Sequence, residues 1–110
     1  MLKEKFDKFN LPLDISCIYT SGYGTGIYLK ENIIKNDSDS IYLIGEMGLK
    51  KELSNFGIKI INDHDDSQEE IGMTDKEISE FKPDPSVIAV VVGYNTSFSY
   101  RKLTTASLYI

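Results

Sequence analysis

Two unbroken apolar runs stand out from the polar background of this chain. One covers residues 87–92, six apolar residues that are mostly β-branched, and a shorter one covers residues 41–44; each run ends at a glycine, Gly93 or Gly45. An apolar run of this kind is typical of a strand covered on both faces, as in parallel sheets packed under helices. Helical patterns follow both runs. The chain is therefore predicted to alternate strands and helices.

The helix after the longer run has a marked beginning. Ser99 is expected to cap a helix over residues 99–110, because its hydroxyl can accept free backbone N–H groups. Phe98 before the cap and Leu103 inside the helix could form a hydrophobic staple. Apolar residues then recur at helical spacing and predict one inward-facing stripe: Leu103, Ala106 and Ile110.

The remaining segments have shorter patterns, read from local breaks and caps. Thr74 and Glu77 form a capping box, which predicts one or two helical turns after it. The other expected elements, in chain order, are a helix end over 1–10 broken by Pro12, an ambiguous stretch over 14–20, a helix capped by Thr20 or Ser21 and running to about Ile34, a polar turn over 36–40, a helix over 46–56 closed by Gly57, a short strand over 58–61, an irregular acidic stretch over 62–73 and a loop over 82–85.

Composition narrows the class of protein. The chain has 110 residues, 41% of them hydrophobic, with a net charge of −5, which fits one small domain or part of a larger one. Nucleic acid is an unexpected partner, because its binding draws on clustered cations and Arg101 is the only arginine. No run approaches the roughly 20 apolar residues of a membrane span, and no signal peptide is recognised. Cys17 cannot form an internal disulfide and is expected to be a buried thiol, so we expect a cytoplasmic protein.

Gly22, Gly24 and Gly26 are the first candidate site. A glycine-rich turn between a strand and a helix can hold the pyrophosphate of a dinucleotide, and Glu46 could then bind a ribose. The fingerprint, however, needs a glycine where this chain has Ile27. The alternative is that Gly22 and Gly26 lie on one helix face and allow close packing. We favour helix packing, and a Rossmann-type dinucleotide-binding module remains an alternative.

Asp63, His64, Asp65 and Asp66 are the second candidate. Carboxylates and imidazole are metal-ligand types, but consecutive side chains point apart and the EF-hand spacing is missing. A solvated acidic loop is the favoured interpretation. No Gly-x-Ser-x-Gly elbow occurs, and no pair of acids stands out for acid–base catalysis. The residues by themselves indicate no catalytic, cofactor or metal site.

Three stretches of the chain carry a family resemblance when taken in order. They are Ile18-Tyr-Thr-Ser-Gly-Tyr-Gly-Thr-Gly-Ile-Tyr-Leu-Lys, then Ile41-Tyr-Leu-Ile-Gly-Glu-Met-Gly-Leu-Lys-Lys-Glu-Leu followed by Gly57-Ile, and Val90-Val-Val-Gly-Tyr-Asn-Thr-Ser-Phe-Ser-Tyr-Arg-Lys-Leu. Together they resemble the phosphoglycolate, pyridoxal and 4-nitrophenyl phosphatases of the haloacid dehalogenase superfamily. The resemblance implies an α/β fold with helices packed on a mainly parallel sheet, incomplete in this chain. Residues 1–39 would be a core-derived helical segment, and residues 40–110 the first part of a class-two cap.

The resemblance also implies a function. The intact protein would be a magnesium-dependent phosphate monoester hydrolase that acts on a small phosphorylated metabolite through an aspartyl-phosphate. The family's Asp-x-Asp-Gly nucleophile motif, its second motif, its later lysine and its acidic magnesium motif are missing from the 110 residues. This chain alone is therefore expected to be inactive and to bind no cofactor. Asn95 stands where relatives often carry Asp, so no carboxylate role carries over to it.

Two further expectations concern partners and class. In several relatives the cap mediates dimerisation, so the resemblance suggests a homodimer through the cap. An unfinished sheet would also leave an open edge that could pair with another copy. A small α/β interaction domain without chemistry is the second alternative to the phosphatase interpretation.

Overall fold

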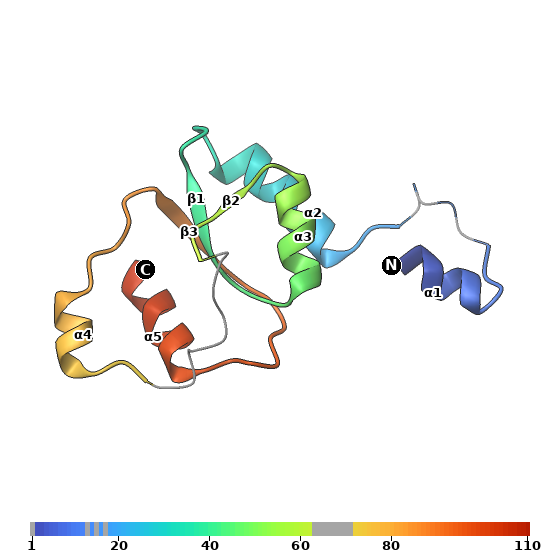
Figure 1. Ribbon diagram of the computed structural model, residues 1–110. Helices are drawn as coiled ribbons and strands as arrows, with labels where there is room; N and C mark the ends of the chain where they lie inside the picture. The colour runs from blue at the N-terminus through green and yellow to red at the C-terminus, as the bar shows by residue number, and fades with distance from the viewer. Residues whose placement is uncertain (1, 13, 15, 17, 63–71) are drawn as a thin grey trace.

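A computed structural model describes residues 2–12, 14, 16, 18–62 and 72–110. Strands and helices alternate from the first strand onward (Figure 1), which confirms the predicted α/β class. Cys17 and the acidic loop 63–66 lie outside the described residues. The elements are α1 (Leu2–Lys8), α2 (Ser21–Tyr28), the π-helical turn η2 (Leu29–Ile33), β1 (Ser40–Ile44), α3 (Met47–Asn55), β2 (Lys59–Ile60), α4 (Asp75–Glu80), β3 (Val87–Val92) and α5 (Tyr100–Tyr109).

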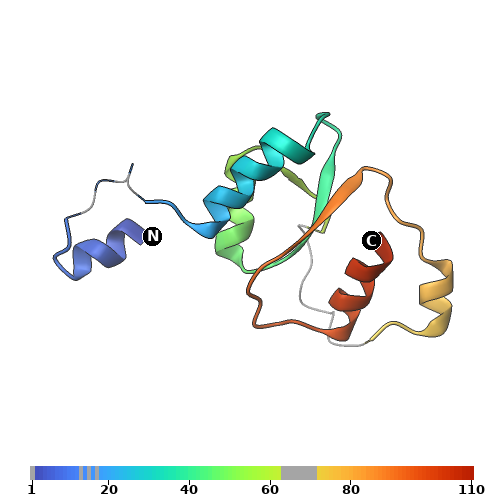
Figure 2. The same cartoon turned by 180° about the vertical axis from the view of Figure 1, so that it is seen from behind.

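The three strands form one parallel sheet in the order β2-β1-β3. The helices α2 and α3 cover one face of the sheet, and α5 lies on the other, as the front and back views show (Figures 1 and 2). All five residues of β1 are buried, because β1 is the central strand and has helices on both sides. Helix α1 stands apart from the sheet.

Alternation along β1 divides the core into two layers. Ile41 and Leu43 point to the α2 and α3 side, whereas Tyr42 and Ile44 point to the α5 side. The first layer also contains Leu29, Leu53, Ile58 and Ile60, with Ile33, Ile34, Leu49, Phe56, Ala89 and Val91 packed against it. The second contains Ala106, with Ile61, Val87, Val90 and Tyr109 packed against it.

Strand β3 is an edge strand among the described residues, and both of its faces contact the core, as predicted: Ala89 and Val91 pack against the layer on the α2 and α3 side, and Val87 and Val90 pack against the layer on the α5 side. Its register with β1 shifts by one residue between the pairs Ser40–Val87 and Ile41–Ala89, which leaves Ile88 without a partner in a bulge. Ile88 is 40% exposed and Val92 is 63% exposed. The cover on the two faces is therefore partial, because Ile88 in the bulge and Val92 at the end of the strand remain exposed.

The predicted inward stripe of α5 was wrong at two of its three residues. Ala106 is buried as expected, but Leu103 is 46% and Ile110 is 96% exposed. The helix instead turns Tyr109 toward the sheet, where its ring stacks on Tyr42 with centroids 5.5 Å apart. The buried face of α5 therefore includes Lys102, which is 3% exposed.

The predicted caps are confirmed. The Thr20 hydroxyl accepts the Tyr23 N–H at 3.1 Å, and the Ser99 hydroxyl accepts the Lys102 N–H at 3.2 Å. Thr74 and Glu77 form the capping box of α4, and Gly57 has a φ of 74° at the end of α3. The staple between Phe98 and Leu103 would bury little, because both side chains are about half exposed.

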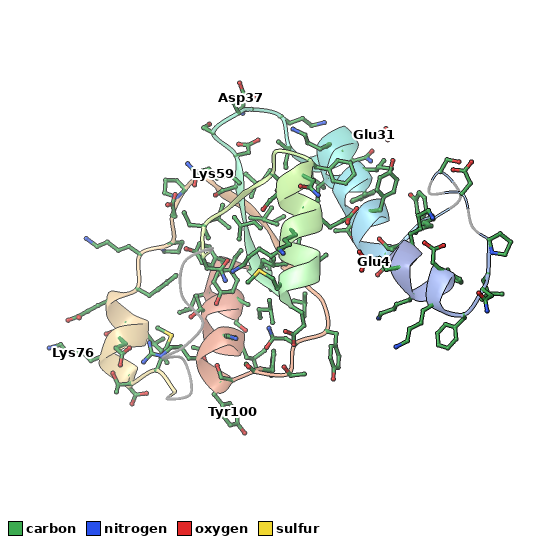
Figure 3. The ribbon with its side chains drawn as sticks, turned by 45° about the vertical axis from the view of Figure 1, so that its right-hand side comes forward. Glu4, Glu31, Asp37, Lys59, Lys76 and Tyr100 are labelled. Carbon is green, nitrogen blue, oxygen red and sulfur yellow. The ribbon has the colours of Figure 1, made fainter. Side chains whose placement is uncertain are left out.

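Helix α4 is tied to α5. The Glu77 carboxylate accepts a hydrogen bond from the Arg101 guanidinium at 2.8 Å, and the Phe81 ring meets Tyr109 edge-on. Lys76 on α4 and Tyr100 at the start of α5 point away from the rest of the molecule (Figure 3). Within the described part of the chain, no helix is long and apolar enough to cross a membrane.

Candidate functional site at the carboxyl ends of the strands

A cleft of about 650 Å³ lies beside the carboxyl ends of β1 and β3. The chain leaves β1 through α3 to reach β2 on one side, whereas β3 pairs with β1 on the other side. In open parallel sheets, ligands bind in the crevice where the strand order reverses in this way. The cleft is lined by Lys3, Ile18, Thr20, Ser21, Gly22, Tyr23, Glu46, Gly48, Leu49, Glu52, Gly93 and Tyr94.

A glycine follows each of the two strands, Gly45 after β1 and Gly93 after β3, and both contact Leu49 in the cleft lining. A Cβ atom built on Gly45 would lie 2.8 Å from the Leu49 side chain, and one on Gly93 would lie 2.7 Å from it. Such separations are shorter than van der Waals contact, so any larger residue would displace Leu49. Glycine at both positions lets the first turn of α3 pack directly on the strand ends.

Hydrogen bonds join the two loops that follow β1 and β3, and we call this network the clasp. The Glu46 carboxylate accepts the Thr96 N–H at 2.6 Å and the Thr96 hydroxyl at 2.8 Å. The Asn95 amide donates to the Gly45 carbonyl at 2.9 Å, and its oxygen accepts the Ser97 N–H at 2.9 Å. The clasp therefore consists of Gly45, Glu46, Asn95, Thr96 and Ser97.

The clasp explains the chemistry of two of its members. The Thr96 N–H and hydroxyl hold the pKa of Glu46 below its usual value, with a smaller contribution from the positive charge of Lys102. Asn95 donates a hydrogen bond that an ionised aspartate could not donate. The amide at this position thus has a structural role of its own.

The glycine cluster does not form a dinucleotide-binding turn. Gly22, Gly24 and Gly26 all lie inside α2, and the Gly24 N–H donates to the Thr20 carbonyl within that helix. A Cβ on Gly26 would overlap the Phe56 ring, and one on Gly22 would lie 3.2 Å from Leu49. The close packing of α2 on α3 is therefore confirmed. The carboxylate expected to bind a ribose, that of Glu46, is bonded to Thr96 instead.

The described residues offer no metal site: nowhere among them do three or more His, Cys, Asp or Glu side chains come close enough to share an ion. The cleft is suited to binding a small molecule, because its described lining combines apolar side chains with the carboxylates of Glu46 and Glu52. The clasp and the cleft could not be read from the sequence, because they join residues 50 positions apart.

Comparison with known proteins identifies the family. The chain is 28% identical over 107 residues to the 4-nitrophenylphosphatase of Schizosaccharomyces pombe, covering 96% of this chain and 35% of that protein. It is 31% identical over 107 residues to the chloroplastic phosphoglycolate phosphatase 1A of Arabidopsis thaliana, covering 97% of this chain and 29% of that protein. The human glycerol-3-phosphate phosphatase is 30% identical over 93 residues, 84% of this chain and 28% of that protein. The chain belongs to the haloacid dehalogenase phosphatases.

Membership of this phosphatase family confirms the resemblance drawn from the three sequence stretches. The chain spans about a third of the length of the curated relatives it matches. No family model matches the chain. The division at residues 39 and 40 and the cytoplasmic location stay predictions.

Proposed function

We propose that this chain is a segment of a phosphate monoester hydrolase and forms the first part of its cap. The observation that carries the proposal is the continuous match to proteins named as phosphatases over 96–97% of the chain. In the intact protein an aspartate would attack the phosphoryl group and a water molecule would hydrolyse the acyl-phosphate. That nucleophile and the magnesium ligands would lie outside the described residues, which hold no metal cluster.

In this proposal the cleft binds the part of the substrate that is not phosphate. Glu46 and Glu52 line the cleft, and Lys3 is the only cation among the described residues of its lining. Carboxylates repel a phosphate dianion at short range, so the phosphoryl group would face away from these two side chains. The apolar members of the lining, Leu49 and Tyr94 among them, would contact an uncharged group.

The activity of the chain and of the natural protein that contains it tests this proposal. The purified chain should release no phosphate from 4-nitrophenyl phosphate, because the family's nucleophile motif is absent from its 110 residues. The natural protein, produced from its complete reading frame, should hydrolyse the same compound, and a chelator should abolish the reaction. Turnover by the chain above a mock purification would contradict the proposal, as would a natural protein without hydrolysis.

The partner remains part of the proposal. A small phosphorylated metabolite is the expected substrate, and a homodimer through the cap is the expected assembly. Sedimentation of the natural protein at several concentrations measures the latter. A monomer at all concentrations would remove the dimer from the proposal without touching the hydrolase assignment.

A further inference from the structure

A buried lysine lies behind the clasp. Lys102 is in the first turn of α5 and is 3% exposed, although lysine is among the residues least often fully buried. Its ammonium group donates a hydrogen bond to the Ser97 carbonyl at 3.1 Å. Burial of a charge is costly unless the charge is paired and hydrogen-bonded. The position of this side chain therefore needs a reason beyond packing.

The reason lies in the loop that follows β3. Three contacts fix this loop: Asn95 is bonded to the Gly45 carbonyl, Thr96 to the Glu46 carboxylate, and the Ser97 carbonyl to Lys102. The positive charge of Lys102 is also close enough to favour the ionised form of Glu46. Two of the three contacts come from the residues that follow β1, Gly45 and Glu46, and the third comes from α5.

Tyr94 is the residue of this loop whose side chain is exposed at the cleft. It precedes the three fixed residues, lines the cleft and is 80% exposed. Contacts at three consecutive residues restrict the backbone of this loop, and they therefore restrict the position of the residue just before them. The clasp and Lys102 thus limit where the Tyr94 ring can lie at the cleft.

We propose that Lys102 is a positioning residue, which holds loop 94–97 so that Tyr94 is presented to the substrate at the cleft. The inference rests on the proposed function, because it assumes that the cleft faces the substrate. Lys102 touches no substrate itself in this account. Its ammonium acts through Ser97 and Glu46, while its aliphatic stem fills space beside the sheet.

A spectroscopic experiment tests the positioning without reference to activity. The chain has no tryptophan, so Tyr94→Trp introduces a single reporter at the cleft. In this background, Lys102→Met keeps a side chain of similar length but removes the charge and the donor. We expect a loss of tryptophan anisotropy and a gain in collisional quenching, with Lys102→Arg closer to the parent. Lys51→Met, the same change at an exposed position of α3, should have no effect.

Thr96→Val provides a milder variant if Lys102→Met fails to fold, which circular dichroism detects. It removes the hydroxyl donor to Glu46 at an exposed residue and leaves the backbone donor in place. We expect a smaller loss of anisotropy in the same direction. Unchanged anisotropy in both folded variants would overturn the proposal.

Kinetics of the natural protein, with Tyr94 intact, give the second readout. Lys102→Met should raise KM about tenfold and change kcat less than about twofold, because the interaction serves substrate binding. Lys102→Arg should recover most of the affinity, and Lys51→Met should match the parent. If Lys102→Met lowers the tryptophan anisotropy but leaves KM unchanged, the proposed role of the loop in substrate binding would be wrong. An inactive parent protein would instead refute the proposed function, and the fluorescence result would still decide the role of Lys102 in the loop.

Discussion

At the scale of single residues, glycine marks the places where a helix approaches another element most closely. Gly26 is the clearest case, because a Cβ there would overlap the Phe56 ring. Gly24 lies in the same helix, but the nearest atoms that a Cβ there would meet belong to Tyr19, which is 69% exposed and can move aside. The spacing of four between Gly22 and Gly26 predicted a shared packing face, and the sequence could not say which glycine is essential.

Gly26→Ala should therefore destabilise the chain. Alanine gains about 1 kcal/mol of helix propensity, but overpacking against Phe56 costs about 1–3 kcal/mol, so the net loss should reach up to about 2 kcal/mol. Gly24→Ala is the matched control and should gain about 0.5–1 kcal/mol. Urea denaturation measures both. A Gly26→Ala chain more stable than the parent would contradict the packing described for α2 and α3.

Glu46 gives the chain a predictable acid sensitivity. The hydrogen bonds from Thr96 lower the folded-state pKa of Glu46 from the ordinary value of 4.5. A lowered folded pKa means that the ionised group contributes stability above the unfolded pKa, and the contribution disappears as the pH falls through the folded pKa. Hydrogen bonds lower the pKa of other carboxyl groups in the same direction: Asp14, Asp39, Glu77 and Asp84.

We therefore expect the urea midpoint to fall as the pH drops below about 5. Glu46→Gln should reduce the slope of this fall, because one titrating group is gone while a side-chain oxygen remains to accept from Thr96. Midpoints measured from neutral pH downward compare the two proteins. Identical slopes would mean that Glu46 does not hold Thr96 in the folded state.

At the scale of secondary structure, a side chain extends the sheet where β2 ends. The Asn62 amide accepts the Leu43 N–H at 3.0 Å and donates to the Leu43 carbonyl at 2.8 Å. It thereby satisfies both backbone groups of a residue that is 5% exposed. The amide thereby continues the hydrogen bonding of β1 beyond the end of the two-residue strand β2.

Asn62→Ala should cost about 1–3 kcal/mol, because it leaves a buried N–H and a buried carbonyl without their partner. Asn62→Asp should lose less, since the carboxylate can still accept from the Leu43 N–H. The free energy of unfolding measures the two variants against the parent. Asn55→Ala, at an exposed position of α3, should leave the free energy of unfolding nearly unchanged. A loss as large as that of Asn62→Ala would contradict the role given to the hydrogen bonds between Asn62 and Leu43.

Local signals in the sequence predicted most of these elements. Caps at Thr20, Thr74 and Ser99 and the stop at Gly57 are formed by neighbouring residues, so they can be read one segment at a time. The face that α5 buries depends on how Tyr109 meets Tyr42 across the fold, and periodicity placed it one residue off at Leu103. The edge position of β3 depends on strand order, which its apolar run does not encode.

At the scale of the whole molecule, the fold places three sequence stretches at one end of the sheet. The first lies in α2, the second ends β1, and the third ends β3, and all three contribute residues to the cleft. The family resemblance in the sequence rests on these same stretches. The cleft itself required the crossover from β1 to β2, and the clasp required residues 50 positions apart. Neither can be derived from local pattern.

The activity of a chimera tests the central claim most directly. The 107 residues of the Schizosaccharomyces pombe 4-nitrophenylphosphatase that match this chain would be replaced by the chain's own residues. If the chain forms the first part of a phosphatase cap, the chimera should fold cooperatively and hydrolyse 4-nitrophenyl phosphate, whereas the chain alone should not. A chimera that folds with a cooperative thermal transition but hydrolyses no phosphate ester would contradict the account.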